Sequence, residues 1–289
     1  LELGLHHEQQ HQELMLTDIK HVFASNPTLP VYREGLWQAS SAPDSRDSWK
    51  SYAEGLFEIG FAEDRFCYDN ELPRHRTFVE QYELRNNTVT NGEFLAFIEA
   101  GGYQQPEYWL SLGWQTVQNE QWQAPLYWKH QDDGWFEFTL GGLKPLDPGR
   151  PVCHVSYFEA DAFCRWAGYR LPTEAEWEIA ASAVPLTGAF VDQMLKQNQA
   201  LHPVSTETDS TPSQMFGNVW EWTTSSYSAY PGYRPAAGAL GEYNGKFMCN
   251  QYVLRGGSVA TSSDHIRTTY RNFFPPEARW QFMGIRPAR

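Results

Sequence analysis

Polar and apolar side chains recur at helical spacing over the first 25 residues of the chain. An apolar side is supplied by Leu14, Met15, Leu16 and Ile19, and Ser25-Asn26-Pro27 supplies a stop. His7 and His11 are four residues apart, so on a helix they lie on one face, one turn apart. The pattern predicts one amphipathic helix over residues 1–25 that presents two neighbouring imidazoles.

The pattern changes after this helix. Residues 26–50 are turn-rich and weakly periodic, which predicts a linker or wrapping segment. From residue 51 to residue 289, short strand patterns alternate with turns and a few helices, without a second break or an internal repeat. The clearest strand patterns are Leu56–Gly60, Arg76–Val79 and Gln251–Arg255. Scattered short strands with few helices favour an α+β domain over residues 51–289.

Three helix starts in this second region are signalled by S/T-x-x-E capping boxes, in which side chains satisfy the first backbone N–H groups. They are Thr90–Glu93, Ser156–Glu159 and Thr173–Glu176. Gly101 and Gly168 then mark the ends of the first two helices.

Composition and charge limit the function classes. The 289 residues are 41% hydrophobic and 15% aromatic, which is ample for a packed core. A net charge of −13 without a basic stripe argues against nucleic-acid binding. No apolar run is long enough to span a membrane. The four cysteines, Cys67, Cys153, Cys164 and Cys249, are widely spread, which indicates reduced thiols and a cytoplasmic protein.

The histidine pair has more than one interpretation. His7-Glu8-x-x-His11 also spells the zinc-protease pattern, in which Glu8 would be the general base. That chemistry needs a third ligand downstream, and none is evident. A helix rich in His and Gln without any ligand is the plainer alternative.

A series of motifs in order resembles the formylglycine-generating-enzyme-like (sulfatase-modifying factor) domain, an elaborated C-type-lectin-like fold. The motifs are Val89–Phe94, Tyr169–Glu178, Gly217–Trp222, Leu254–Ser258 and Gly284–Arg286. Formylglycine-generating enzymes hold copper with two cysteines after the R-G-G-S motif. The corresponding positions here are Thr261 and Ile266, so the resemblance does not extend to that copper chemistry.

We assign most of these motif residues to the fold. Glycines suit turns, tryptophans suit a core, and Arg255 with Glu178 are candidate buried partners. The same structural role is expected for the isolated polar residues His154, His202, His265, Glu221 and Asp264. Backbone carbonyls around Asn218–Trp220 are a possible structural Ca²⁺ site, as in some lectin-like relatives.

The opening helix in front of such a domain resembles the arrangement of the ergothioneine-biosynthesis sulfoxide synthases (hercynine oxygenases). Two further stretches, Gly241–Met248 and Tyr270–Pro276, also look like this family. In these enzymes a DinB-like helical bundle supplies three histidines to a non-haem Fe(II). The resemblance implies that His7 and His11 are two ligands on the last helix of that bundle, with the third histidine upstream of this sequence.

The resemblance also implies the reaction and its substrates. The family uses O₂ to join cysteine sulfur to C2 of the imidazole of hercynine (Nα-trimethylhistidine) and oxidises that sulfur to a sulfoxide. Gln10 and Asn272 match positions that hold hercynine's imidazole and carboxylate, and Tyr243 matches a tyrosine that contacts hercynine through its hydroxyl. Phe273 offers the aromatic face that suits a trimethylammonium group.

Two departures from the best-known branch matter. Enzymes that use γ-glutamylcysteine carry Trp-Asp where this chain has Phe273-Phe274, and the Asp pairs with the donor's amino group. An apolar Phe274 cannot do this, which predicts free cysteine as the donor. A catalytic tyrosine of that branch falls near Leu240 here, and no proton donor is assigned.

Other functions are compatible with the same residues. A selenoneine synthase would look very similar and take a selenosugar as donor. An ovothiol synthase would use histidine and commonly adds a C-terminal methyltransferase domain. A lectin-like binding module without catalysis is the rival from another class.

Overall fold

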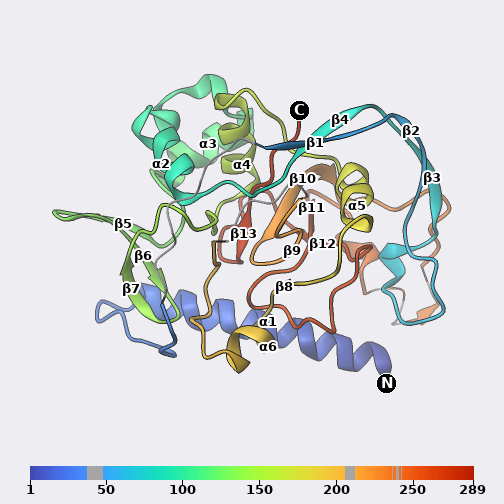
Figure 1. The fold of residues 1–289 in the computed structure, drawn as a ribbon, viewed down its shortest axis with the longest axis horizontal. Coiled ribbons are helices and arrows are strands. Elements are labelled where there is room, and N and C mark those ends of the chain that lie inside the picture. The colour runs from blue at the N-terminus through green and yellow to red at the C-terminus, as the bar shows by residue number, and fades with distance from the viewer. Residues whose placement is uncertain (38–47, 206–211, 236, 239–240, 242) are drawn as a thin grey trace.

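The computed structural model describes residues 1–37, 48–205, 212–235, 237–238, 241 and 243–289. One long helix, α1 (Glu2–Ser25), crosses the bottom of the view in Figure 1, and a body of mixed strands and helices lies above it. The C-terminus lies on the opposite side of this body from α1. The α1 helix and the body therefore face one another along the whole helix, as an α+β fold with a helix against one side.

The remaining helices are short and belong to the body. The α-helices are α2 (Asn91–Glu99), α3 (Ser111–Glu120), α4 (Tyr157–Trp166), α5 (Glu174–Ser182) and α6 (Val191–Lys196). The 3₁₀ turns are η1 (Asp69–Glu71), η2 (Gly102–Gln104), η3 (Pro106–Tyr108) and η5 (Gly245–Phe247). All three predicted capping boxes are present, at the starts of α2, α4 and α5.

The strands form small sheets. A four-stranded sheet of order β12-β11-β10-β13 stands at the centre of Figure 1, with β10 antiparallel to β11 and parallel to β13. Two- and three-stranded sheets surround it: β1-β4, β2-β3, β5-β6-β7 and β8-β9. The strands are β1 (Trp49–Tyr52), β2 (Gly55–Ile59), β3 (His75–Val79), β4 (Tyr82–Arg85), β5 (Trp128–Gln131), β6 (Gly134–Thr139), β7 (Gly142–Pro145), β8 (Gly188–Ala189), β9 (Phe216–Gly217), β10 (Trp220–Ser226), β11 (Tyr252–Arg255), β12 (Asn272–Phe274) and β13 (Met283–Gly284). The three predicted strand patterns coincide with β2, β3 and β11.

The sequence motifs build the core of the body, as expected. Trp177, Trp220 and Trp222 are fully buried there. Arg255 is also fully buried and forms an ion pair of 2.6 Å with Glu178. Gly256 has a φ of +99°, and a Cβ there would lie 2.5 Å from the Met215 carbonyl oxygen, so only glycine fits the turn after β11.

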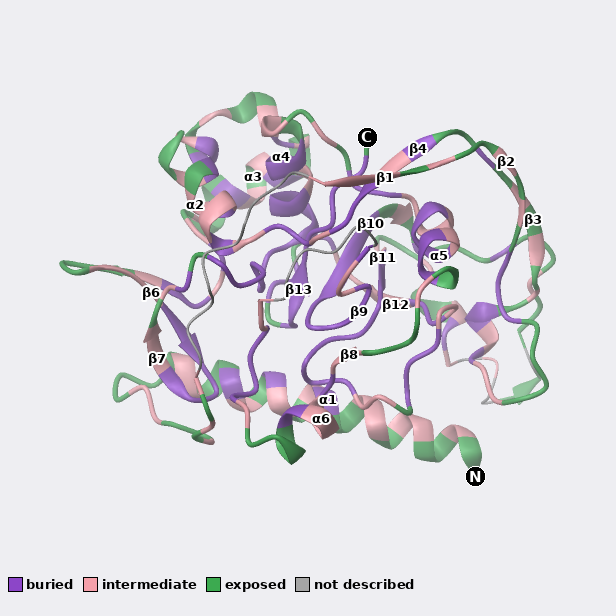
Figure 2. Ribbon diagram, in the orientation of Figure 1, coloured by how far each residue is buried: buried purple, intermediate pink, exposed green. Residues whose placement is uncertain are grey.

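The buried face of α1 differs from the predicted apolar side. Met15 is 53% exposed, whereas the fully buried side chains of α1 are Glu13, Thr17 and Lys20. Leu16 and Ile19 are only partly buried, against a small apolar cluster of the body. Figure 2 shows the same result, since α1 is mostly pink and green with few purple turns. Glu13 and Lys20 make polar contacts with the body, to which Leu16 and Ile19 add partly buried apolar contacts.

Three further predictions from the sequence, on the linker, the cysteines and membrane-spanning segments, can be compared with the structure. Residues 38–47 of the predicted linker lie outside the described residues, and β1 begins inside its last part, at Trp49. All four cysteines are free thiols. Among the described helices, none combines the length and the apolar character that crossing a membrane requires.

Candidate active site

A cavity of about 640 Å³ lies between the first half of α1 and the body. From α1, the side chains of His7, Gln10, Glu13 and Leu14 line it. The opposite walls come from the segment before η1, the central sheet, the segment around η5 and β12. Their lining residues are Tyr68, Asn70, Trp220, Tyr243, Asn244, Lys246, Phe247, Gln251, Tyr270, Arg271, Asn272, Phe273, Phe274 and Gln281. All five predicted substrate-binding residues and one of the two predicted metal ligands therefore lie around one cavity.

The two predicted metal ligands are in contact. The Nε2 atoms of His7 and His11 are 3.1 Å apart, as expected for residues one helical turn apart whose rings turn toward each other. Imidazole nitrogens bind a divalent metal at about 2.1 Å, so two ligands at right angles on one ion are about 3 Å apart. The separation of these two nitrogen atoms is therefore compatible with adjacent positions on a single metal ion. His7 is half-buried and His11 is exposed, which leaves the other positions of such an ion open.

Gln10 connects α1 to two tyrosines of the body. Its Oε1 atom accepts a hydrogen bond from the Tyr243 hydroxyl, and its Nε2 atom donates to the Tyr270 hydroxyl at 2.6 Å. The Tyr243 ring also packs edge-on against His7, with centroids 5.2 Å apart. Tyr270 was not singled out from the sequence, although it opens the Tyr270–Pro276 stretch that carries the resemblance. Leu240, the position of the other family tyrosine, lies outside the described residues.

The three neighbouring candidates lie on β12. Phe273 stacks on Tyr227 with centroids 3.9 Å apart and lies 5.8 Å from Phe247. Phe274 packs edge-on against Trp280. Asn272 lines the cavity beside them, and its Oδ1 atom accepts from the Phe273 backbone N–H at 2.9 Å. Aromatic rings therefore line the cavity around β12, together with the side chains of Lys246 and Arg271, and the carboxylate among the described lining residues is Glu13 of α1.

Glu13 fastens α1 to the segment that carries the R-G-G-S motif. Its Oε1 atom accepts from Trp220 Nε1 at 2.7 Å and from the Ser258 hydroxyl at 2.9 Å, and its Oε2 atom accepts from Thr261 at 3.0 Å. Burial raises the pKa of Glu13, and these three hydrogen bonds oppose the rise. Thr261 occupies one of the positions that hold cysteine in formylglycine-generating enzymes. Glu13 of α1 therefore contacts one of the two positions to which the resemblance assigns those cysteines.

The other polar residues of the motifs have structural partners. Glu221 is fully buried, pairs with Arg286 at 2.7 Å and accepts from Trp177 Nε1 at 2.6 Å. Asn218 makes two side-chain hydrogen bonds of 2.9 Å with the backbone of Val204, so its amide is used within the fold.

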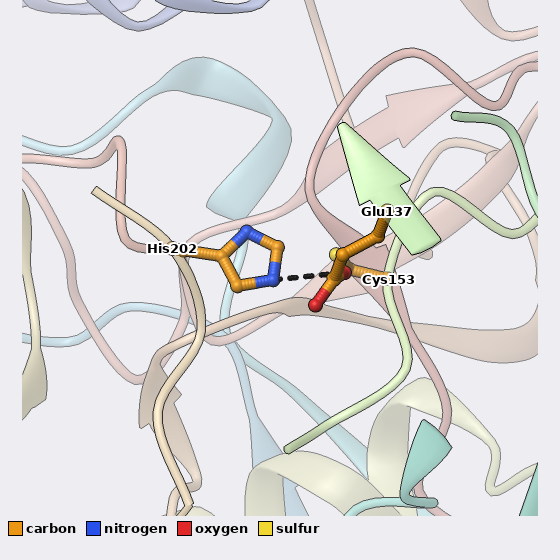
Figure 3. Close-up of side chains that lie close together, drawn as sticks. All are labelled: Glu137, Cys153 and His202. Atoms are coloured by element: carbon orange, nitrogen blue, oxygen red, sulfur yellow. Dashed lines mark ion pairs between the residues drawn. The ribbon is translucent and has the colours of Figure 1, made fainter. Parts of the chain in front are cut away.

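A second cluster of potential ligand atoms is buried away from the cavity. Glu137, Cys153 and His202 form the only group of three such residues found among the described residues, with ligand atoms within 4.8 Å of one another (Figure 3). Glu137 Oε2 lies 3.0 Å from His202 Nε2. Burial raises the pKa of the Cys153 thiol to about 12, which favours the neutral thiol. The cluster lies near Lys20, which is about 14 Å along α1 from His11.

The buried ammonium group of Lys20 indicates that this cluster has a structural role. The Lys20 ammonium is fully buried, 2.6 Å from His154 Nε2 and above the rings of Tyr127 and Phe282. A divalent cation at the cluster would face this ammonium, which opposes metal binding there. We therefore assign the cluster to the docking of the second half of α1.

A Lys20→Met variant tests this docking. Burial lowers the pKa of Lys20 from 10.5 to about 8, so above pH 8 the unfolded chain binds more protons than the folded chain. Wild-type stability then rises with pH, by about 3 kcal/mol from this group in total. We expect the wild type to gain about this much relative to Lys20→Met between pH 8 and pH 10.5, in urea unfolding followed by fluorescence. Parallel pH profiles of the two proteins would contradict the burial of a charged amine.

Comparison with known proteins identifies the class of domain that forms the body. Residues 39–289 match the sulfatase-modifying factor enzyme 1-like domain. PvdO from Pseudomonas aeruginosa has the same fold, with a TM-score of 0.57 at 21% identity over 88% of this chain and 99% of that one. The body of the molecule is therefore a formylglycine-generating-enzyme-like domain, here with a two-histidine helix across its site.

Relatives over the whole chain are more specific. The hercynine oxygenase of Mycobacterium tuberculosis is 35% identical, with 98% of this chain and 69% of that protein covered. The hercynine oxygenase of Mycolicibacterium thermoresistibile is 33% identical, with 98% and 67% covered. The chain belongs to the hercynine oxygenase family, and it is an oxidoreductase.

Proposed function

We propose that this chain is the substrate-enclosing part of an Fe(II)- and O₂-dependent sulfoxide synthase of ergothioneine biosynthesis. The enzyme joins the sulfur of cysteine to the imidazole C2 of hercynine. The observation that carries the proposal is that His7, Gln10, Tyr243 and the aromatic end of β12 surround one cavity of about 640 Å³, within the usual range for small-molecule sites.

Each residue has a role that follows from its chemistry. His7 and His11 hold the metal on one face of α1, with a third histidine supplied by an upstream DinB-like bundle whose last helix is residues 1–25. Ferrous iron at such a three-imidazole face supplies open positions for O₂ and a thiolate. Residues 26–50 then serve as the linker, and residues 51–289 as the domain that closes the cavity.

The body of the molecule binds and orients hercynine. Tyr227 covers one face of Phe273 by stacking, so the other face is available to the trimethylammonium group, which cannot form hydrogen bonds. Gln10 and Tyr243 hold the imidazole near His7, and Asn272 lies at the end of the cavity where the carboxylate would be bound.

Reconstitution of the full-length protein tests the proposal. We expect one Fe(II) per chain to bind anaerobically, and a cysteine–hercynine sulfoxide to form, detected by mass spectrometry, only when hercynine, cysteine and O₂ are all present. Turnover with Zn(II), or without O₂, would contradict the proposed chemistry. Hercynine binding without any turnover would favour the binding-module alternative.

The choice of donor is a separate prediction. Because Phe274 packs on Trp280 and carries no charge, nothing at this position pairs with the amino group of γ-glutamylcysteine. We expect kcat/KM for cysteine to exceed that for γ-glutamylcysteine by at least about tenfold, the size of one lost charge-assisted hydrogen bond. Steady-state assays with both thiols, and with a selenosugar as a third donor, measure this. A preference for γ-glutamylcysteine would overturn the assignment.

A further inference from the structure

A continuous chain of hydrogen bonds leads from an exposed carboxylate to the cavity. Asp264 Oδ1 accepts from Gln9 Nε2 at 2.7 Å, and Gln9 Oε1 lies 3.1 Å from His265 Nδ1. His265 Nε2 lies 3.1 Å from the Tyr270 hydroxyl, which accepts from Gln10 Nε2 at 2.6 Å. Gln10 Oε1 finally accepts from the Tyr243 hydroxyl. These six residues, the Asp264 relay, comprise Gln9 and Gln10 from α1 and four residues from the body.

The hydrogen bonds of the relay can be arranged in only one donor-to-acceptor order. An ionised carboxylate can only accept, so Gln9 must turn its NH₂ group toward Asp264 and its oxygen toward His265. The Ser262 hydroxyl, which donates to Asp264 at 2.7 Å, holds the pKa of Asp264 below its usual range, and the Gln9 amide acts in the same sense. The end of the relay is therefore a fixed acceptor at the surface.

His265 continues this donor-to-acceptor order from Gln9 to Tyr270 at the cavity. Burial, followed by the nearby Arg267 cation, lowers the pKa of His265 to about 3, so the ring is neutral and carries a single N–H. With Gln9 oxygen at Nδ1, that proton must be on Nδ1, and Nε2 must accept from Tyr270. His6 Nδ1, 3.4 Å from His265 Nδ1, is consistent as a second acceptor for the same N–H.

The donor and acceptor roles of Tyr270 and Gln10 then follow. The Tyr270 hydroxyl donates a hydrogen bond to His265 Nε2, and its oxygen accepts from the NH₂ group of Gln10. The Gln10 oxygen must point toward Tyr243, and it keeps a second lone pair. A free glutamine side chain could present either end to the cavity, but this one cannot rotate without breaking two hydrogen bonds.

We propose that the Asp264 relay is a positioning device that fixes the Gln10 amide with its oxygen available as acceptor for a ring N–H of the bound substrate. His265 and Asp264 act through Tyr270 and Gln9 and do not touch the substrate. The identity of that substrate as hercynine rests on the proposed function. The relay explains why a neutral histidine and an exposed aspartate lie behind the cavity wall.

The tautomer of His265 tests the relay without any assay of turnover. We expect the ¹⁵N spectrum of histidine-labelled, iron-free, full-length protein to show His265 protonated at Nδ1, with assignment by loss of the signal in His265→Gln. Free histidine prefers the other tautomer, so protonation at Nε2 would overturn the relay. This outcome does not depend on which ligand the cavity binds.

Substrate binding supplies the second test. His265→Leu removes the acceptor for Tyr270, whereas His265→Gln places an oxygen near the position of Nε2. By calorimetry on the iron-loaded full-length protein, we expect hercynine affinity to fall about tenfold in His265→Leu and at most about threefold in His265→Gln. The KM for cysteine and the iron content stay at wild-type values in both. A loss in both variants together with lost iron would indicate a merely structural role.

A substitution at the exposed residue Asp264 tests the relay without disturbing the buried core. Asp264 is exposed, so Asp264→Asn removes the fixed acceptor without disturbing the core, and Asp18→Asn is the matched control on the exposed side of α1. We expect a several-fold weaker affinity for hercynine in Asp264→Asn only. Equal affinities would contradict the relay. If the wild type itself does not bind hercynine, the proposed function fails, while the tautomer measurement still decides the relay.

Discussion

Replacing His11 with alanine is expected to abolish oxygen-dependent C–S bond formation in the intact enzyme while leaving it folded. The His11 side chain is exposed, and its recorded contacts are with His7, at 3.1 Å between Nε2 atoms. The fold therefore loses nothing from its removal, whereas the metal loses one of its imidazole ligands. Iron affinity should fall by at least about 100-fold, the upper range seen when even an outer partner of a ligand is removed.

The measurement is iron content after gel filtration, together with product formation and the far-UV circular dichroism spectrum. Gln12→Ala is the control, because Gln12 is an exposed neighbour on the same helix. Turnover unchanged in His11→Ala would refute the metal assignment and with it the proposed function. Loss of the folded signal in His11→Ala would instead refute the peripheral placement of its side chain.

Replacing Glu13 with alanine is expected to give the largest loss of stability, about 3 kcal/mol. The change removes the acceptor of the buried Trp220 indole N–H and two hydroxyl partners, Ser258 and Thr261. It also frees the part of α1 that carries His7 and Gln10, so iron affinity should fall together with stability. Urea unfolding and iron titration of the same variant measure both effects.

Glu13→Gln separates lost packing from lost charge. The glutamine oxygen can still accept from Trp220, and a hydroxyl can rotate to accept from the new NH₂ group. Because burial raises the pKa of Glu13, removing its charge costs little, and we expect a loss below about 1 kcal/mol. Equal losses in the two variants would show that the carboxylate charge, and not the hydrogen-bond acceptors, holds α1.

The sequence predicted local structure well where the cause was local. The capping boxes at Thr90, Ser156 and Thr173 join residues three apart, so the sequence contains both partners of each bond. The same holds for the contact of His7 with His11, which helical spacing alone brings together. The candidate residues of the cavity came instead from resemblance, and they do lie around one cavity.

The buried face of α1 could not be predicted from its own pattern. Periodicity indicated an apolar side, but Glu13 and Lys20 are buried because Trp220 and His154 lie opposite them. These partners are 207 and 134 residues away along the chain. From the sequence alone, such a polar residue is predicted to lie on the surface, because the distant partner that allows its burial is not known.

By itself, then, the sequence determined the helices α1, α2, α4 and α5, the strands β2, β3 and β11, the two-histidine face and membership of a family. Only the tertiary structure decided which side of α1 docks, that His265 and Asp264 stand behind Gln10, and that Lys20 marks a cluster separate from the cavity. The physical reason is the range of the interactions. Capping and helical spacing act within one turn, whereas hydrogen bonds between buried groups depend on segments that meet only when the chain has folded.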